Sequence, residues 1–277
     1  MSAAVVCVGL ATQDSIFALP RHPGADDRVV ATELAVAGGG PAATAAVALV
    51  RLGIETAFVG AVGDDGVGTA VRDGLEREGV DVSELALVAG ARSPQSSILV
   101  TGEGRTIVHF PGSLPLLAPS ERALALMHEA SWVHVDHAGY RAVPREVRLS
   151  IDGGNPISGL DLAGVALYGP TDAALARDLG SADQALAAGA ELVVVTRGAQ
   201  GCVAYTGSRV VEAPATPIRD PVSTLGAGDV FHGALLAALV RDDPLADALA
   251  FANRAAALSC RALDGRSAIP TLEEVRA

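Results

Sequence analysis

Short apolar strands and helix starts alternate along the second half of the chain. Strands are predicted over 132–136, 147–152 and 192–196, and helices capped by Thr171 and Ser181 fall between the last two of them. Such alternation is typical of a parallel sheet with helices on both faces. Because ligands of these sheets bind beyond the carboxyl ends of the strands, the residues that follow each strand are the first candidates for a site.

The N-terminal part of the chain departs from this alternation. Residues 1–9 predict a first, buried strand, but residues 15–37 are interrupted by prolines and have strand character over 28–36. Farther on, 96–101 and 106–110 predict two strands joined by a hairpin turn.

We therefore expect a small β flap, or lid, formed by parts of 15–37 and 92–112. It would belong to one domain spanning residues 1–277. Between the strand that ends at Asp136 and the strand that ends at Asp152, the chain is too short for a full crossover helix.

Composition narrows the classes of partner. Only 3% of the residues are aromatic, and the formal net charge of −12 repels a phosphate backbone, so we expect no nucleic-acid partner. No apolar run is long enough to cross a bilayer and the N-terminus lacks the basic start of a signal peptide, which predicts a cytoplasmic protein without a membrane partner. The three cysteines lie in apolar sequence and are expected to be reduced core thiols.

The strongest local signal for chemistry is the run Leu225-Gly-Ala-Gly-Asp229. The apolar periodicity over 230–239 predicts a helix, so Asp229 lies in its first turn. Unpaired N–H groups and the positive end of the helix dipole attract a phosphoryl group there, while an ionised carboxylate can take a proton from an attacking hydroxyl. Taken alone, an acidic residue at a helix start is equally explained as a helix-stabilising charge.

Two glycine-rich segments, far apart in the sequence, carry a family resemblance. The first is Gly38-Gly-Gly-Pro-Ala-Ala-Thr44 with its continuation over 59–66, and the second is 223–229. Together they resemble the two signatures of the ribokinase/PfkB carbohydrate-kinase family, and the likeness continues to Pro270. It implies a ribokinase-like α/β fold: a three-layer sandwich with a central, mostly parallel sheet, helices on both faces and a small β lid.

The resemblance also implies an ATP-dependent kinase acting on a primary hydroxyl of a ketose or related sugar. By that resemblance, Asp229 is the general base that deprotonates the hydroxyl. The amides of Gly226, Ala227 and Gly228 would form the anion hole for the transferred phosphoryl group.

On the sugar side, the resemblance assigns Asp14 to hold hydroxyl groups just past the first strand. Gly39 and Gly40 would let the sugar lie against the backbone, and Thr44 stands where the family usually has Asn. Asp136, at the end of its strand, is a further candidate hydroxyl acceptor, with a helix cap or a solvated turn residue as the alternative.

On the nucleotide side, residues 196–201 match the strand-turn-strand that supports ATP in the family. Thr196, Gly198 and Gly201 are therefore expected in nucleotide binding. Asn253 belongs by resemblance to the late helix that lines the adenine pocket, although an ordinary polar helix position explains it equally well.

Within the family, the chain most resembles sulfofructose kinases, in 38–47, 94–98, 228–235 and 265–270. Where that group holds a sulfonate with Asn and Arg, this chain has His109 and Ala138, and only Arg28 offers a comparable cation. We therefore carry over the kinase activity but not the sulfonated substrate, and a sulfofructose-like sugar stays open as one of the ketoses. His109 is expected to reach from the lid toward the sugar, with a solvent-facing position as the alternative.

Two departures from the family concern the cofactors. Ser223 replaces the Asp that helps to organise a monovalent-cation site, so potassium dependence is not predicted. The family's Asn-x-x-Glu motif, linked to magnesium, is replaced by Thr171-Asp-Ala-Ala174. Mg²⁺ is still expected, because the ATP phosphates and water can supply most of its ligands. The protein ligands for the metal are not identified.

Other readings stay open beside the sugar kinase. A nucleoside kinase of the same scaffold is the nearest alternative, and a sugar- or nucleotide-binding relative without catalysis is suggested by the two departures. A nicotinamide-dependent enzyme is disfavoured, because no Gly-x-Gly-x-x-Gly turn follows the first strand. The exposed strand edges of a lid are commonly covered by a partner, so we expect a homodimer through the lid.

Overall fold

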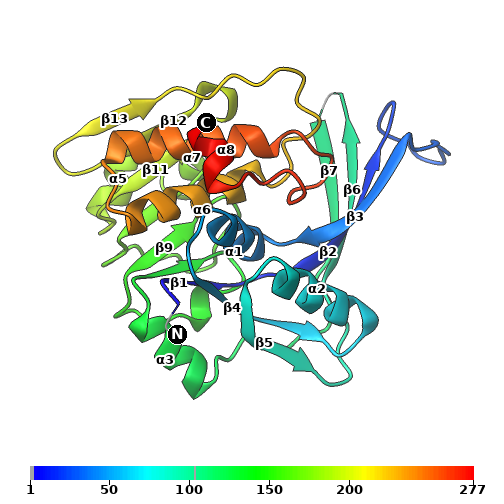
Figure 1. The fold of residues 1–277 in the computed structure, drawn as a ribbon, viewed down its shortest axis with the longest axis horizontal. Helices are drawn as coiled ribbons and strands as arrows, with labels where there is room; N and C mark the ends of the chain where they lie inside the picture. Colours follow the sequence, from blue (N-terminus) through cyan, green and yellow to red (C-terminus); the bar gives the residue numbers. More distant parts are fainter. Residues whose placement is uncertain (1–2, 103) are drawn as a thin grey trace.

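A central sheet runs through the structure, a computed structural model that describes residues 3–102 and 104–277 (Figure 1). Nine strands of the described residues form it in the order β13-β12-β11-β10-β9-β8-β1-β4-β5. Neighbours from β11 to β5 are parallel, and β12 and β13 continue one edge as antiparallel strands. In chain order the strands are β1 Val5–Val8, β4 Thr56–Gly63, β5 Asp81–Val88, β8 Trp132–Val135, β9 Leu149–Asp152, β10 Leu167–Gly169, β11 Val193–Thr196, β12 Cys202–Tyr205 and β13 Val210–Ala213.

Helices cover both faces of this sheet. Helices α1, α2, α6, α7 and α8 share one apolar core with it, and α3, α4 and α5 share a second core on the opposite face. The expected three-layer α/β sandwich is therefore confirmed. The helices are α1 Pro41–Arg51, α2 Gly66–Arg77, α3 Glu121–Glu129, α4 Asp172–Asp178, α5 Ala182–Ala187, α6 Ala227–Val240, α7 Leu245–Ser259 and α8 Leu272–Arg276, with 3₁₀ turns η1 Tyr140–Ala142 and η2 Gly198–Gln200.

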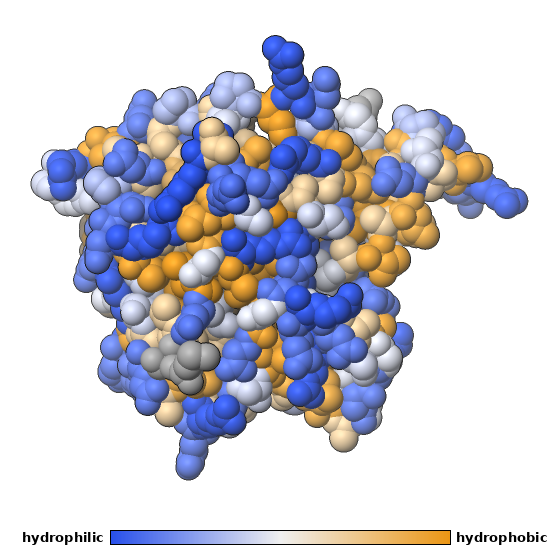
Figure 2. Space-filling model, in the orientation of Figure 1, coloured by the Kyte–Doolittle hydropathy of each residue, from blue (hydrophilic) through white to orange (hydrophobic). Residues whose placement is uncertain are grey.

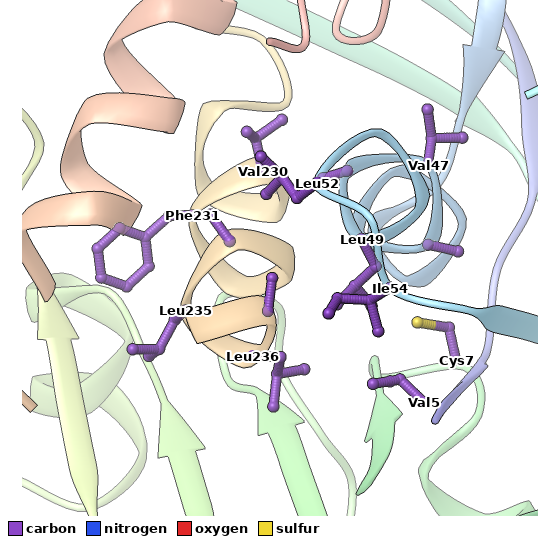
Figure 3. Close-up of a cluster of buried hydrophobic side chains, with 14 of the residues drawn as sticks. Val5, Cys7, Val47, Leu49, Leu52, Ile54, Val230, Phe231, Leu235 and Leu236 are labelled. Carbon is purple, nitrogen blue, oxygen red and sulfur yellow. The ribbon is translucent and has the colours of Figure 1, made fainter. Parts of the chain in front are cut away.

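The core is built from aliphatic side chains because the strands are covered on both sides. All four residues of β1 are fully buried, as expected of a central parallel strand. Figure 3 shows Leu49 of α1 and Leu236 of α6 gathered above Val5 of β1. Close packing is helped by small residues, since a Cβ at Gly233 of α6 would lie 2.6 Å from the carbonyl oxygen of Ala45 in α1.

Side-chain caps fix where several helices begin. Thr171 and Ser181 accept backbone N–H groups at the starts of α4 and α5, as predicted, and Asp65 does the same for α2 through the amide of Gly68. Each such cap contributes about 1 kcal/mol. These local signals are why the helix starts can be located from sequence.

A second sheet of four strands forms the lid, in the order β3-β2-β6-β7. Both segments from which a flap was expected supply its strands, which are β2 Thr12–Ala18, β3 Glu33–Gly39, β6 Gln95–Thr101 and β7 Gly104–Phe110. The β6–β7 pair is an antiparallel hairpin in which Ser96 faces His109. Residue 103 of its expected turn, like residues 1 and 2 of the expected first strand, lies outside the described residues.

One strand boundary differs from the expectation. Strand character was predicted over 28–36, but β3 starts at Glu33 and runs on through the glycines to Gly39. The bounds of β3 follow from its pairing with β2. This pairing runs from Thr12, opposite Gly39, to Ala18, opposite Glu33. Between β8 and β9 the described chain forms only the short turn η1, in agreement with the segment being too short for a crossover helix.

One expectation from composition, that of reduced thiols in the core, has a structural counterpart. Cys7, Cys202 and Cys260 are free and buried, and burial raises the pKa of each thiol, as expected of inert core residues. In the part of the chain that the structure describes, no helix has both the length and the apolar character needed to cross a bilayer.

Candidate active site

A cleft of about 430 Å³ opens between the lid and the carboxyl ends of the central strands. Two segments that are far apart in sequence line it together: residues 38–41, which lead into α1, and residues 224–226, which lead into α6. The ends of β9 and β11 and the lid strands β2, β6 and β7 supply further lining residues. The fold thus brings both glycine-rich segments to one site.

Helix α6 begins at a residue that must be glycine. Gly226 adopts a left-handed conformation with φ of 74°, and a Cβ there would lie 2.9 Å from the Cα and the carbonyl oxygen of Gly265. A Cβ at Gly228 would meet nothing within 4 Å, so open space lies in front of the first helical turn. A ligand can therefore approach the backbone at this point.

The backbone N–H groups of this turn differ in whether they already have a hydrogen-bond partner. Among the described residues, the N–H groups of Gly226 and Gly228 have no partner, whereas Ala227 N–H donates to the carbonyl oxygen of Thr224 at 3.3 Å. Free amides at a helix N-terminus bind anions, with the helix dipole adding to the attraction. The turn therefore offers two free amides to an anion, whereas Ala227 can offer its amide only if the weak turn bond to Thr224 opens.

Asp229 presents its carboxyl group to the cleft from the first turn of α6. Burial raises the pKa of this carboxyl well above its ordinary value, and the charges of Asp152 and Asp136 raise the pKa further. Arg266 and Arg105 act on the same pKa in the opposite direction. A carboxylate with a raised pKa is a stronger base near neutral pH, which suits it to accept a proton from a hydroxyl.

Asp14 faces the cleft from the lid strand β2. Its side chain is buried, and Thr12 Oγ1 donates a hydrogen bond to its Oδ1 at 2.8 Å. Burial raises the pKa of Asp14, against hydrogen bonds from Thr12 and Ser96 that lower it. The carboxylate fits here only because Gly39 has no side chain, since a Cβ at Gly39 would overlap its Oδ2.

The remaining sugar-side candidates Gly40, Thr44 and His109 all line the cleft. Gly40 has a φ of 93° and precedes α1, where a Cβ would overlap the carbonyl oxygen of Leu10. Thr44 is buried on α1, and His109 extends from β7 with Nδ1 3.3 Å from Ser96 Oγ. Burial lowers the pKa of His109, partly offset by Asp14. His109 therefore tends to be neutral and can donate or accept a hydrogen bond.

Arg28, in contrast, does not reach the cleft. It is exposed in the loop between β2 and β3 and makes no hydrogen bond or ion pair among the described residues. The guanidinium group that does line the cleft belongs to Arg105 of β7, which sequence reasoning missed. Its Nη1 donates to Thr224 Oγ1 at 3.0 Å and so links the lid to the turn before α6.

Asp136 is a second correction. It is buried and both of its oxygens are used by backbone amides, so it has little capacity left for a sugar hydroxyl, and it does not line the cleft. The amide donors are those of Leu10 at 2.9 Å and Ala42 at 3.2 Å to Oδ2, and of Ala138 at 2.8 Å and Gly139 at 3.1 Å to Oδ1. Asp136 thereby holds the ends of β1 and β8 and the start of α1 together. This role is close to that of a helix cap, which was the alternative to binding a sugar hydroxyl.

On the nucleotide side, the structure brings Thr196 to the cleft at the end of β11. Gly198 and Gly201 form the turn between β11 and β12, both with positive φ, and do not line the cleft. The side-chain amide of Asn253 donates to the carbonyl oxygens of Ala213 at 3.1 Å and Pro214 at 3.0 Å. Asn253 therefore fastens α7 to the end of β13, away from the cleft.

Sequence reasoning missed Asp152 as a site residue, although it ends a predicted strand. Asp152 lines the cleft at the carboxyl end of β9, and its Oδ1 lies 3.6 Å from Nε2 of His232, one turn after Asp229 in α6. The His232 ring is 5.6 Å from that of buried His134. The strand end was a usable signal for Asp152, whereas the contact with α6 depends on tertiary packing.

No group of three or more His, Cys, Asp or Glu side chains within residues 3–102 and 104–277 is arranged to hold a metal ion. The cleft does contain oxygen donors of the kind that Mg²⁺ prefers, on Asp152, Asn155 and Thr171. Thr171 also caps α4, so the segment that replaces the Asn-x-x-Glu motif lies at the edge of the cleft.

Comparison with known proteins shows the family of this chain. Residues 2–151 and 165–272 match the family described as pfkB family carbohydrate kinase. The chain belongs to this family and is an ATP-dependent sugar kinase of the ribokinase type.

Individual relatives span nearly the whole chain. A ribokinase from Bacillus subtilis is 29% identical, covering 98% of this chain and 97% of the relative. An ATP-dependent ribose-1-phosphate kinase from Halopiger xanaduensis is also 29% identical, over 99% and 97% of the two chains. The structure of an Arabidopsis thaliana ribokinase complexed with ribose and ATP superimposes with a TM-score of 0.82, at 22% identity over 100% of this chain and 98% of the other, and shows the shared fold.

Proposed function

We propose that this kinase transfers the γ-phosphoryl group of ATP to a primary hydroxyl of a ketose or related furanose, with Asp229 as general base. One observation carries the proposal: the carboxyl of Asp229, the free amides of Gly226 and Gly228, and the carboxyl of Asp14 share one cleft. A hydroxyl acceptor, a base and an anion-binding turn are what phosphoryl transfer to an alcohol requires.

We assign the residues of the cleft to a sugar side, a nucleotide side and the reacting centre between them. Asp14, with Gly39, Gly40, Thr44 and His109 around it, orients the sugar so that one hydroxyl points at Asp229. Thr196 marks the nucleotide side, at the end of β11. As the hydroxyl oxygen attacks the γ-phosphorus, Asp229 accepts its proton, and the helix N-terminus stabilises the charge on the transferred group.

Mg²⁺ bound with ATP would neutralise phosphate charge, and Asp152, Asn155 and Thr171 supply oxygens that suit it. We do not propose a monovalent-cation site. At the position of the family's Asp, the hydroxyl of Ser223 is buried and accepts a hydrogen bond from Leu225 N–H at 3.1 Å.

A substrate panel tests the proposal. Ketoses, sulfonated ketoses, sugar phosphates and nucleosides are assayed for ADP formation with MgATP, with and without potassium. We expect kcat/KM for the preferred ketose to exceed that for every nucleoside by about tenfold or more. One or two additional hydrogen bonds between the enzyme and the preferred substrate are enough to produce a difference of this size. A sulfonated ketose belongs in the panel because Arg105 lines the cleft, although Arg28 does not.

The panel also separates the alternatives. Preference for a nucleoside would replace the ketose proposal by the nucleoside kinase. Calorimetric binding of a sugar without ADP release under any cation would favour a binding protein that has lost catalysis. Asp229 and the free amides beside it count against that second alternative.

A homodimer through the lid is the second part of the proposal. The lid face turned away from the cleft exposes apolar side chains, with 57% of Leu34, 59% of Val36 and 62% of Val108 accessible. Apolar side chains reach the surface over the lid on the right of Figure 2. Their alternate neighbours, such as Ala35, pack on the inner side of the lid. An exposed apolar sheet face of this kind is typical of an interaction surface.

Sedimentation measures the dimer. We expect a dimer mass at micromolar concentration, and a monomer mass for Val108→Glu, because burying an unpaired carboxylate in the interface is costly. Val210→Glu is the matched control, since Val210 is also 62% exposed but lies on β13, outside the lid. A monomeric wild-type protein, or a Val108→Glu variant that stays dimeric, would contradict the proposal.

We also propose a cytoplasmic location. Its support is the set of three free, buried thiols, which is typical of proteins from a reducing compartment.

A further inference from the structure

A second cavity of about 320 Å³ lies beside Gly38, the first residue of the segment 38–41 that is expected to hold the sugar and that we call the sugar loop. Residues of α1, α2 and β3 and of the segment 264–267 line it, and Gly38 lines both this cavity and the cleft. Its volume is at the lower end of the range of about 300–1,000 Å³ that is typical of small-molecule sites. The proposed function does not use it.

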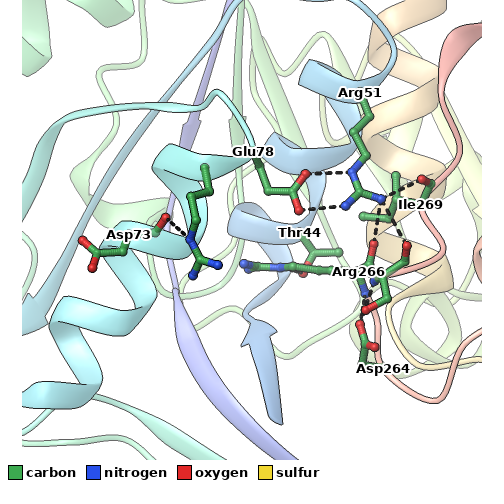
Figure 4. Close-up of polar contacts among 9 residues, drawn as sticks. Thr44, Arg51, Asp73, Glu78, Asp264, Arg266 and Ile269 are labelled. Atoms are coloured by element: carbon green, nitrogen blue, oxygen red, sulfur yellow. Dashed lines mark hydrogen bonds and ion pairs between the residues drawn. The ribbon is translucent and has the colours of Figure 1, made fainter. Parts of the chain in front are cut away.

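The buried guanidinium of Arg266 forms one wall of the cavity. Only 7% of the residue is exposed, and its Nη2 donates to the carbonyl oxygen of Gly39 at 2.6 Å. Its Nε donates to Thr44 Oγ1 at 3.2 Å, and Figure 4 shows these two side chains next to each other. Among the described residues, no carboxylate lies within ion-pair distance of Arg266, and its Nη1 has no hydrogen-bond partner. A buried positive charge without an ion pair is costly, and Nη1 remains available to a ligand.

A second guanidinium that makes no ion pair among the described residues lines the same cavity. Arg77, in the last turn of α2, donates from Nε to the carbonyl oxygen of Asp73 at 3.1 Å and makes no ion pair with any described carboxylate. Two like charges that face one cavity repel each other, and an anion between them removes the repulsion.

The acidic side chains of the cavity are already occupied. Glu78 makes a two-pronged pair with Arg51, at 2.7 and 2.8 Å, which Figure 4 shows beside the loop that carries Arg266. Asp264 Oδ1 accepts the backbone amides of Arg266 and Ser267 at 2.8 and 2.7 Å. Glu78 and Asp264, like Asp14 and Asp229, favour the positive charge of Arg266 at longer range, but none of these carboxylates is hydrogen-bonded to its Nη1 or paired with Arg77 among the described residues.

We propose that this cavity is a second ligand site, which binds a phosphate-type oxyanion between Arg77 and Arg266. Guanidinium groups pair with phosphate oxygens through parallel hydrogen bonds, which favours this class of anion over a halide. Inorganic phosphate and the phosphate group of a small monoester have the same recognition chemistry, and the cavity has room beyond the anion itself.

Occupancy of the site is coupled to the sugar loop. Arg266 holds Gly39, and Gly39 abuts Asp14, so an anion that fixes Arg266 also fixes the residues expected to hold the sugar. We therefore expect a bound oxyanion to lower KM for the sugar more than it changes kcat. This coupling rests on the proposed function, whereas binding of the anion does not.

Titration calorimetry tests the site directly. Inorganic phosphate and glycerol 3-phosphate are titrated separately into the protein saturated with magnesium and the ATP analogue AMP-PNP, at constant ionic strength, so that the turn before α6 is already occupied. We expect binding that weakens by about tenfold or more in Arg77→Gln, since a charged hydrogen-bonded contact is lost. Arg72→Gln is the matched control, because Arg72 lies on the same helix but does not line the cavity.

The calorimetric and kinetic results bear separately on the anion site and on its coupling to the sugar. Tighter binding of one probe identifies free phosphate or a phosphate monoester as the better ligand. No binding of either probe, equal affinity in Arg77→Gln and wild type, or an equal loss in Arg72→Gln would overturn the site. A sugar KM that does not respond to a probe that binds would overturn the coupling alone. If the panel finds no sugar substrate, calorimetry still measures the anion site, so the two proposals fail separately.

Discussion

Replacing Asp229 by Asn is expected to lower kcat by about 10²–10⁴ while KM for the sugar changes little, because general-base catalysis contributes about that factor. Asn keeps the size and the hydrogen-bonding shape of the side chain but cannot accept the proton of the attacking hydroxyl. A coupled assay of ADP formation on the preferred substrate of the panel gives both constants. Turnover near that of the wild type would remove Asp229 from the mechanism.

The pH dependence of the wild-type enzyme is a second test of Asp229 as the general base. The base works only when deprotonated, so kcat/KM should fall as the pH drops through the raised pKa of Asp229. In Asp152→Asn, a negative charge near Asp229 is lost, so the pKa of Asp229 falls and the acid limb of kcat/KM moves to lower pH. Asp183→Asn, a change in the first turn of α5 outside the cleft, is the control. An acid limb that stays in place in Asp152→Asn would contradict this account of the base.

The second large effect is expected for Gly39→Ala. A Cβ at position 39 would overlap Asp14 Oδ2 and lie 2.7 Å from Thr12 Oγ1, so the carboxylate must leave its position. Loss of a hydrogen bond from a sugar hydroxyl to a charged acceptor costs about 1.5–3 kcal/mol, which corresponds to an increase in KM of about 10- to 150-fold. Steady-state kinetics with varied sugar concentration at saturating ATP measure it.

The control for this prediction is Gly66→Ala. Gly66 begins α2, and a Cβ there would meet nothing within 4 Å, so neither KM nor stability should suffer. Asp14→Asn should reproduce the KM increase of Gly39→Ala without any clash. An unchanged KM in Gly39→Ala would show that Asp14 does not hold the sugar. A comparable KM increase in Gly66→Ala would show that the effect is not local.

The parts of the fold that could be predicted are those with local signals. The starts of α4 and α5 are marked by Thr171 and Ser181, whose hydroxyls satisfy free amides, and strands such as β11 are marked by runs of β-branched residues. The boundary of β3 could not be placed in the same way. It depends on which residues of β2 are available to pair with β3, and these residues lie in another segment of the chain.

The site was predictable to the same extent. Asp14, Gly39 and Gly226 stand in the glycine-rich segments or near a strand end, and the fold brings them to one cleft. Arg28 and Asp136 show the limit. A charge in a loop does not reveal whether the loop faces the cleft, and a carboxylate at a strand end does not reveal that four amides already occupy its oxygens. Arg266 carries no local signal at all, since its partners Gly39 and Thr44 are more than 200 residues away in sequence.

By itself, the sequence determined the layered α/β architecture, the two glycine-rich turns and the acidic residue at the start of α6, because helix caps, strand periodicity and backbone freedom act between residues that are neighbours in the chain. Only the tertiary structure decided which polar groups have unused hydrogen-bonding capacity and face a cavity. Desolvation and charge pairing depend on everything that packs around a group, and at Asp229, Asp136 and Arg266 those neighbours come from distant segments of the chain.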